Sequence, residues 1–219
     1  MVIAVPTYKI AYMALPKAGC SSVKQALARI DPDVTVPDQD VIHFDTWHEI
    51  YPTTRFRPHR WEAYNKPGWF RFCVVRDPVK RLLSVYTNRV VQLGELKNSR
   101  KILSGEVNLP TTPDPDYFFR NLDAYRAASS TIKHHAMKTW LFIGPKPLLY
   151  DRVYKTEELG ELAQDLSRHS GRNVVMPRSN SSDMKLTLDD LRPHTIDAIR
   201  PFLNFEYDFL SDFYDNPLS

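Results

Sequence analysis

The chain has 219 residues, of which 42% are hydrophobic and 25% are charged, so one globular domain with a substantial core is expected. Its net charge of +3 suits small anionic ligands and gives no case for a nucleic-acid partner. No apolar run reaches transmembrane length, and the N-terminus lacks a basic start followed by an apolar signal core. We therefore expect a single domain over residues 1–219 that is soluble and cytoplasmic, with both cysteines as buried thiols.

The first predicted elements are a strand and a helix joined by a short loop. Residues 9–15 are mostly apolar, as in a buried strand, and Pro16 ends the run. Gly19 favours a tight turn with a close backbone approach. A helix is expected next, because apolar side chains recur with helical spacing at Val23, Ala26, Leu27 and Ile30. The sequence PKAGCSSVK, residues 16–24, therefore indicates an anion site at a helix N-terminus, where backbone N–H groups lack helical partners.

This loop also carries a cation and hydroxyl donors. Lys17 adds a positive charge, and Ser21 and Ser22 add hydroxyl groups. It is not a Walker A loop, because the lysine precedes the glycine and no GK[ST] sequence occurs in the chain. Cys20 is not followed by the arginine that a phosphate-cradling cysteine nucleophile requires. The alternative reading is an ordinary strand, turn and helix with a solvated lysine.

The second informative segment is VVRDPVKRLLSVY, residues 74–86. A buried strand is predicted over residues 70–75, with Asp77 as a helix N-cap and Pro78 at the first helical position. The helix places a polar stripe away from its core-facing side, formed by Asp77, Arg81, Ser84 and Asn88. Arg76 could bind a phosphate through its forked guanidinium while Ser84 donates to the same group. The alternative is a capped surface helix with a structural arginine.

Two phosphate sites suggest a nucleotide that carries phosphates at both ends of its ribose. Together the segments resemble the nucleotide-binding signatures of sulfotransferases that use 3′-phosphoadenosine 5′-phosphosulfate (PAPS). PKAGCSSVK is similar to the 5′-phosphosulfate loop of that family, and RDPVKRLLSVY is similar to its 3′-phosphate segment. The nearest likeness is to carbohydrate sulfotransferases of the heparan and chondroitin types and their bacterial relatives. A weaker likeness continues through residues 150–166 and 203–213.

The resemblance implies an enzyme that moves a sulfuryl group from PAPS to an acceptor hydroxyl, on a carbohydrate or a small molecule, and releases 3′,5′-adenosine bisphosphate. Lys17 is expected to be catalytic as well as cofactor-binding, because it can offset charge on the leaving group. The cofactor-binding residues implied are Lys17, Ala18, Gly19, Cys20, Ser21 and Ser22 in the loop, Arg76 and Ser84 in the second segment, and Arg178, Ser182 or Lys185 in a later loop.

The remaining elements agree with an α/β fold. Residues 148–154 predict a strand, Thr156 caps a following helix, and Thr187 starts another helix. Strands that alternate with helices predict a three-layer sandwich around a central, mostly parallel sheet. The resemblance makes this the P-loop-like nucleotide-binding fold of the sulfotransferases. Ligands of such sheets bind at the carboxyl ends of the strands, where both phosphate segments lie.

The candidate base lies between the two segments, in VIHFDTWHEIYP, residues 41–52. Its order of His, Asp, Trp and Glu is similar to the base-bearing stretch of the heparan sulfate 6-O-sulfotransferases, with one additional residue here. The likeness makes His43 the base for the acceptor hydroxyl, and a histidine suits that task. His48 is the competing histidine, Glu49 and Asp45 are the other candidates, and both histidines could instead be structural.

Three further features have two readings each. A basic cluster with interleaved aromatic residues could hold an acidic sugar or be a solvated loop, and it comprises Arg55, Phe56, Arg57, His59, Arg60 and Trp61. Residues 98–116 form a proline-containing tract that is either a flap near the acceptor or a passive loop. His134 and His135 could line an acceptor cleft, but no residues near them have zinc-ligand spacing, so no metal is expected.

Two other functional classes share the phosphate loops. A nucleoside or metabolite kinase would bind ATP with Mg²⁺, but it should show a Walker A lysine. A non-catalytic nucleotide-binding module would keep the loops and lack the base. Stabilisation by 3′,5′-adenosine bisphosphate rather than by ATP with Mg²⁺ distinguishes the sulfotransferase from the kinase.

Overall fold

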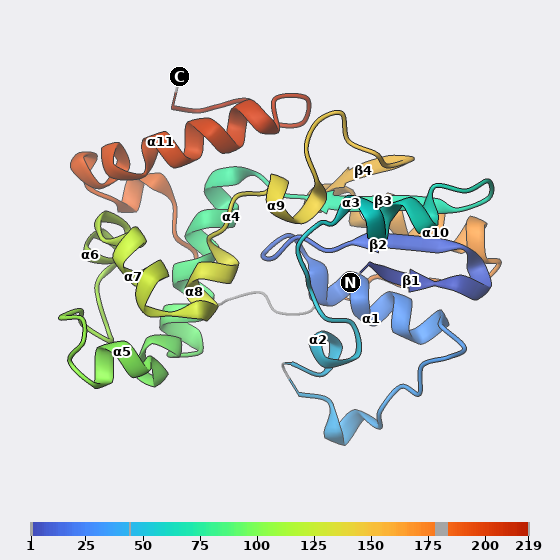
Figure 1. Ribbon diagram of the computed structural model, residues 1–219, viewed down its shortest axis with the longest axis horizontal. Coiled ribbons are helices and arrows are strands. Elements are labelled where there is room, and N and C mark those ends of the chain that lie inside the picture. Colours follow the sequence, from blue (N-terminus) through green and yellow to red (C-terminus); the bar gives the residue numbers. More distant parts are fainter. Residues whose placement is uncertain (1, 44, 178–183, 219) are drawn as a thin grey trace. The chain divides into compact units, whose positions relative to one another are not determined.

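The computed structural model describes residues 2–43, 45–177 and 184–218 (Figure 1). Its elements fall into two units. The sheet unit comprises Met1–Arg76 and Thr139–Ser181. The helical unit comprises Asp77–Lys138 and Ser182–Ser219. The boundary therefore falls within the second phosphate segment, between its arginine and its aspartate.

The sheet has four strands in the order β1-β2-β3-β4 (Figure 1). The strands are β1 (Ile3–Val5), β2 (Ile10–Met13), β3 (Phe70–Val75) and β4 (Arg152–Lys155). β2, β3 and β4 are parallel, whereas β1 is antiparallel to β2. Met13 pairs with Cys73, so β2 and β3 send the chain out at the same edge of the sheet. The expected α/β fold with a mostly parallel sheet is confirmed.

Helices cover both faces of this sheet. One face packs its buried strand residues against α1 (Cys20–Ile30), α2 (Thr46–Ile50) and α10 (Leu159–Ser170). The opposite face carries Cys73, and Tyr150 lies near it. Burial raises the pKa of the Tyr150 hydroxyl. The Tyr150 hydroxyl donates to the Ile143 carbonyl at the end of α9 (Trp140–Ile143), and its ring meets Trp61 of α3 (Pro58–Trp61) edge to face.

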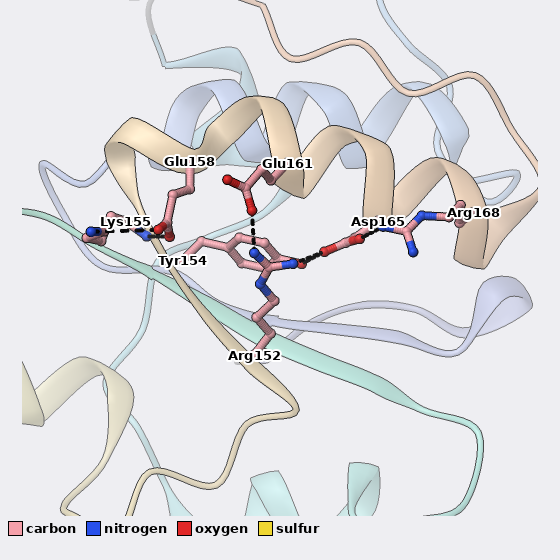
Figure 2. A network of polar contacts seen from close by, with 7 residues as sticks. All are labelled: Arg152, Tyr154, Lys155, Glu158, Glu161, Asp165 and Arg168. Atoms are coloured by element: carbon pink, nitrogen blue, oxygen red, sulfur yellow. Dashed lines mark hydrogen bonds and ion pairs between the residues drawn. The ribbon is translucent and has the colours of Figure 1, made fainter. Parts of the chain in front are cut away.

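A polar network ties α10 to β4 (Figure 2). The Arg152 guanidinium donates to Asp165 at 2.7 Å and to Glu161 at 2.5 Å. Asp165 also accepts from the Tyr154 hydroxyl and from Arg168. Tyr154 is fully buried in the sheet, so Asp165 connects α10 to a core residue of β4.

The helical unit consists of helices around its own apolar core. Its α-helices are α4 (Pro78–Val85), α5 (Arg100–Leu103), α6 (Pro115–Arg120), α7 (Leu122–Ala128), α8 (Ser130–His135) and α11 (Pro193–Phe209). α4 continues directly into a π-helix over Tyr86–Gln92. Short 3₁₀ helices complete the elements described in the two units, at Pro6–Tyr8, Gln39–Val41, Glu62–Tyr64, Glu95–Asn98, Thr156–Glu158 and Leu188–Asp190.

The start of α4 is anchored to α11. The Asp77 carboxylate accepts from the Lys80 backbone N–H at 2.8 Å, as an N-cap, and from the Tyr207 hydroxyl at 2.8 Å. Arg81 is 2% exposed and donates to Glu206, which is fully buried, at 2.9 Å. The expectation that this polar stripe faces away from the core is therefore wrong for Arg81 and for Asn88, which is also buried.

Candidate functional site

The loop between β2 and α1 has an unusual backbone. Lys17 and Gly19 both adopt left-handed conformations, with φ of 66° and 71°. A lysine rarely adopts this conformation, because its Cβ crowds the following carbonyl. The Ala18 N–H donates to the Leu15 carbonyl at 3.2 Å, which closes the turn. The turn leads into α1, whose first backbone N–H groups have no carbonyl partners within the helix.

Gly19 is favoured by its left-handed backbone, and it lies close to the connection from β4 into α10. A Cβ at Gly19 would lie 3.4 Å from the Leu159 side chain and 3.9 Å from that of Thr156. Both neighbours belong to the connection from β4 into α10. The loop between β2 and α1 therefore packs against the start of α10, which the Asp165 network ties to β4.

Arg76 joins the two sequence motifs. It follows β3, and its guanidinium donates to the Lys17 carbonyl at 3.0 Å. Fifty-nine positions separate these residues in the sequence, but parallel pairing of β2 and β3 brings the ends of the two strands together. The arrangement places a permanent cation against the loop, at the strand edge where α/β sheets bind ligands.

The family model described as "Sulfotransferase family" matches residues 1–211 of the chain. The chain belongs to the sulfotransferase family. Searches of curated proteins and of solved structures gave no match. The family model spans both units, so it covers the phosphate loop, the second segment and the helices that follow.

This sulfotransferase places His48 beside the loop helix. The Ser21 hydroxyl lies 2.9 Å from His48 Nε2, and the Lys24 ammonium lies 3.0 Å from His48 Nδ1. Lys24 also donates to the Thr53 hydroxyl at 2.6 Å. Lys24 is fully buried, and this burial lowers the pKa of its ammonium group. Sequence reasoning missed Lys24 and Thr53; the available signal was a lysine three residues after Ser21, on one side of a helix.

His43, the expected base, lies on the surface. Its side chain is 61% exposed, and its Nε2 lies 3.9 Å from the Glu49 carboxylate. Its backbone N–H donates to the Thr46 hydroxyl at 2.9 Å, just before α2. Asp45, another candidate, is exposed and immediately precedes α2. The role of His43 as base stays a prediction.

The other expected cofactor residues differ in burial. Ala18, Cys20 and Ser22 are buried at the loop and the helix start. Cys20 and Cys73 are both buried and free of disulfides, as expected, and burial raises the pKa of the Cys73 thiol.

The 3′-phosphate role of Ser84 also stays a prediction. Its hydroxyl donates to the Arg81 carbonyl at 2.7 Å, one turn back in α4. Donation to a phosphate would require that hydroxyl to rotate. Arg178 and Ser182 lie outside the described residues, and Lys185, the third residue of that expected set, is exposed.

The basic cluster combines exposed cations with a half-buried Phe56 and a buried Trp61. Arg55, Arg57, His59 and Arg60 lie at or near the surface. Trp61 is buried and donates its indole N–H to the Leu149 carbonyl at 2.9 Å. Trp61 is therefore a core residue rather than part of an exposed binding surface.

No metal group is found in the described parts of the chain, where no three His, Cys, Asp or Glu side chains converge. His135 instead contacts the Thr131 carbonyl at 2.9 Å, and its ring meets that of His134 edge to face. Within the same residues, none of the helices has both the length and the apolar character needed to cross a membrane.

Proposed function

We propose that this sulfotransferase takes its sulfuryl group from PAPS and transfers it to an acceptor hydroxyl, most readily one on a carbohydrate. The hydrogen bond from Arg76 to the Lys17 carbonyl carries the proposal. It unites a helix N-terminus and its lysine with a second cationic segment, as a nucleotide with two separated phosphate groups requires.

Different residues bind the two ends of the cofactor. The backbone N–H groups at the start of α1, with the Ser21 and Ser22 hydroxyls, bind the 5′-phosphosulfate. Arg76 and Ser84 bind the 3′-phosphate, which distinguishes PAPS from ATP. Arg178 and Ser182 complete the nucleotide site, and the whole chain, residues 1–219, acts as one catalytic domain.

The reaction moves one sulfuryl group between two oxygens. The acceptor oxygen forms a bond to sulfur while the bond from sulfur to the bridging phosphate oxygen breaks. His43 takes the acceptor proton, and the leaving phosphate oxygen keeps the electron pair. Lys17 and the helix N-terminus stabilise the charge on that oxygen, so most of the catalytic effect comes from positioning and electrostatics.

A ligand panel tests this assignment. Thermal unfolding is measured with 3′,5′-adenosine bisphosphate, with adenosine 5′-phosphate and with ATP plus Mg²⁺, since a ligand that binds only the folded state raises the melting temperature. The bisphosphate should give the largest rise. Stabilisation by ATP with Mg²⁺ alone would instead indicate a kinase. Labelled PAPS and a panel of carbohydrates, lipids, small alcohols and peptides then identify the acceptor. Cytoplasmic location stays a prediction, which fractionation of the native host tests.

A further inference from the structure

The contact between His48 and α1 suggests a role other than that of a base. Lys24, on the second turn of α1, reaches His48 Nδ1 at 3.0 Å, while Ser21 lies 2.9 Å from Nε2. The imidazole ring therefore bridges a buried lysine and a hydroxyl of the phosphate loop. His48 itself is only partly buried, whereas Lys24 is 0% exposed and is held on its other side by Thr53.

The direction of these hydrogen bonds follows from the lysine. A charged ammonium has three N–H donors and no lone pair, so a neutral His48 must accept at Nδ1. Its proton then lies on Nε2 and is donated to the Ser21 oxygen. Once that oxygen accepts from the ring, the hydroxyl proton of Ser21 has to point elsewhere. Ser21 becomes a donor for an anion at the start of α1.

We propose that Lys24 and His48 are positioning residues that fix Ser21 as a hydrogen-bond donor to the 5′-phosphosulfate. The inference rests on the proposed function for the identity of the anion. The order of protons does not, because Lys24, His48 and Ser21 are already in contact without a ligand. The opposite order would require an uncharged Lys24 that accepts a proton from Nδ1.

Nitrogen NMR of the imidazole tests the order of protons in the ligand-free protein. At mildly alkaline pH, the neutral ring of His48 should show a protonated Nε2 and an unprotonated Nδ1. Replacing the lysine in Lys24→Met should release this preference. A protonated Nδ1 in the wild-type protein would overturn the inference, whatever the nucleotide proves to be.

A double-mutant cycle tests the consequence for binding, with 3′,5′-adenosine bisphosphate as the probe. One charge-assisted hydrogen bond corresponds to about tenfold or more in affinity. Lys24→Met should therefore weaken binding by about tenfold in the wild-type background but have little effect in a Ser21→Ala background. Equal weakening in both backgrounds would mean that Lys24 acts by another route and would overturn the proposal. Arg29→Met, which removes an exposed cation from the same helix, is the matched control.

Conservative replacement of the histidine separates positioning from a general structural effect. A glutamine side chain at this position would offer an oxygen to Lys24 and an N–H to Ser21, so His48→Gln should retain most of the bisphosphate affinity. His48→Leu should lose it to the same extent as Ser21→Ala. Equal losses of bisphosphate affinity in His48→Gln and His48→Leu would contradict the inference. Failure of the wild-type protein to bind the bisphosphate at all would contradict the proposed function, while the NMR result would still decide the proton order.

Discussion

At the scale of single residues, the phosphate loop is unusual because its lysine has a positive φ. The Lys17 φ of 66° is a conformation that costs a non-glycine residue about 1–2 kcal/mol. The Arg76 guanidinium holds the carbonyl of that same residue. Backbone strain that surrounding contacts maintain is typical of functional sites. The strained residue is also the one proposed to meet the leaving group.

Lys17→Gly and Lys17→Ala should both lower the rate of sulfuryl transfer, by about 10²- to 10³-fold, as for removal of one preorganised donor. Glycine accepts the left-handed backbone, so Lys17→Gly isolates the loss of the ammonium from distortion of the loop. Single-turnover rates and bisphosphate titrations on both variants provide the test. Wild-type turnover in Lys17→Gly would remove Lys17 from the mechanism.

His43→Ala should lose about 10²- to 10⁴-fold in transfer rate, the usual range for general-base catalysis. Binding of the bisphosphate should be unchanged, because the imidazole is proposed to act on the acceptor. Transfer assays on His43→Ala and Glu49→Gln, once an acceptor is known, measure this effect and that of the neighbouring carboxylate. A near-normal rate in His43→Ala would leave Glu49 or Asp45 as the candidate base.

At the scale of elements, each phosphate segment is held by a distant partner. The loop before α1 packs through Gly19 against the start of α10, and α4 is held to α11 by a fully buried ion pair. Neither partner could be inferred from local sequence, because Glu206 lies 125 positions from Arg81. Local sequence predicts that a helix forms, whereas tertiary contacts decide which of its sides is buried.

Gly19→Ala should destabilise the protein and weaken bisphosphate binding. Gly19 and Gly171 have nearly equal φ values, 71° and 67°, but a Cβ at Gly171 would meet nothing within 4 Å. Gly171→Ala therefore reports the cost of the left-handed backbone alone, about 1–2 kcal/mol. Denaturant unfolding should show similar losses of stability for the two variants, because a Cβ at Gly19 would meet Leu159 only at an ordinary contact distance. Bisphosphate titration should show a loss of affinity only for Gly19→Ala. Unchanged bisphosphate affinity in Gly19→Ala would contradict the binding role proposed for this loop.

Glu206→Gln should destabilise folding by about 3–5 kcal/mol, because it leaves Arg81 as a buried charge without its carboxylate. The matched control is Asp197→Asn on the same helix, whose exposed pair with Arg200 should contribute under about 1 kcal/mol. Urea unfolding curves of the two variants give the comparison. A double variant, Arg81→Met with Glu206→Leu, should recover much of the loss. Similar small effects in both single variants would contradict the importance assigned to the buried pair.

At the scale of the whole molecule, the sequence predicted those strands and helices that depend mainly on the pattern of neighbouring residues. β3 has the predicted bounds, and α1 carries the predicted apolar stripe. β4 starts later than predicted, at Arg152, and part of the tract expected to be a loop is the helix α5. Several helices span only four to seven residues, too few for a reliable periodic pattern. They form because tertiary packing stabilises them.

The candidate site was likewise predictable only where its residues belong to a sequence motif. The two strand-to-helix motifs contain Lys17, Gly19 and Arg76. The structure brings these motifs together through the hydrogen bond from Arg76 to the Lys17 carbonyl. The approach of His48 to Ser21 and Lys24 depends on how α2 packs on α1, which no local pattern reveals.

We propose that the loop of residues 16–24 and Arg76 together recognise a nucleotide with phosphates at both ends of its ribose. Calorimetric titration with 3′,5′-adenosine bisphosphate and with adenosine 5′-phosphate tests it most directly. Charge-assisted hydrogen bonds contribute about 1.5–3 kcal/mol each, so loss of the 3′-phosphate should weaken binding by at least about tenfold. In Arg76→Ala this preference should disappear. Equal affinity of the wild-type protein for the two nucleotides would contradict the account.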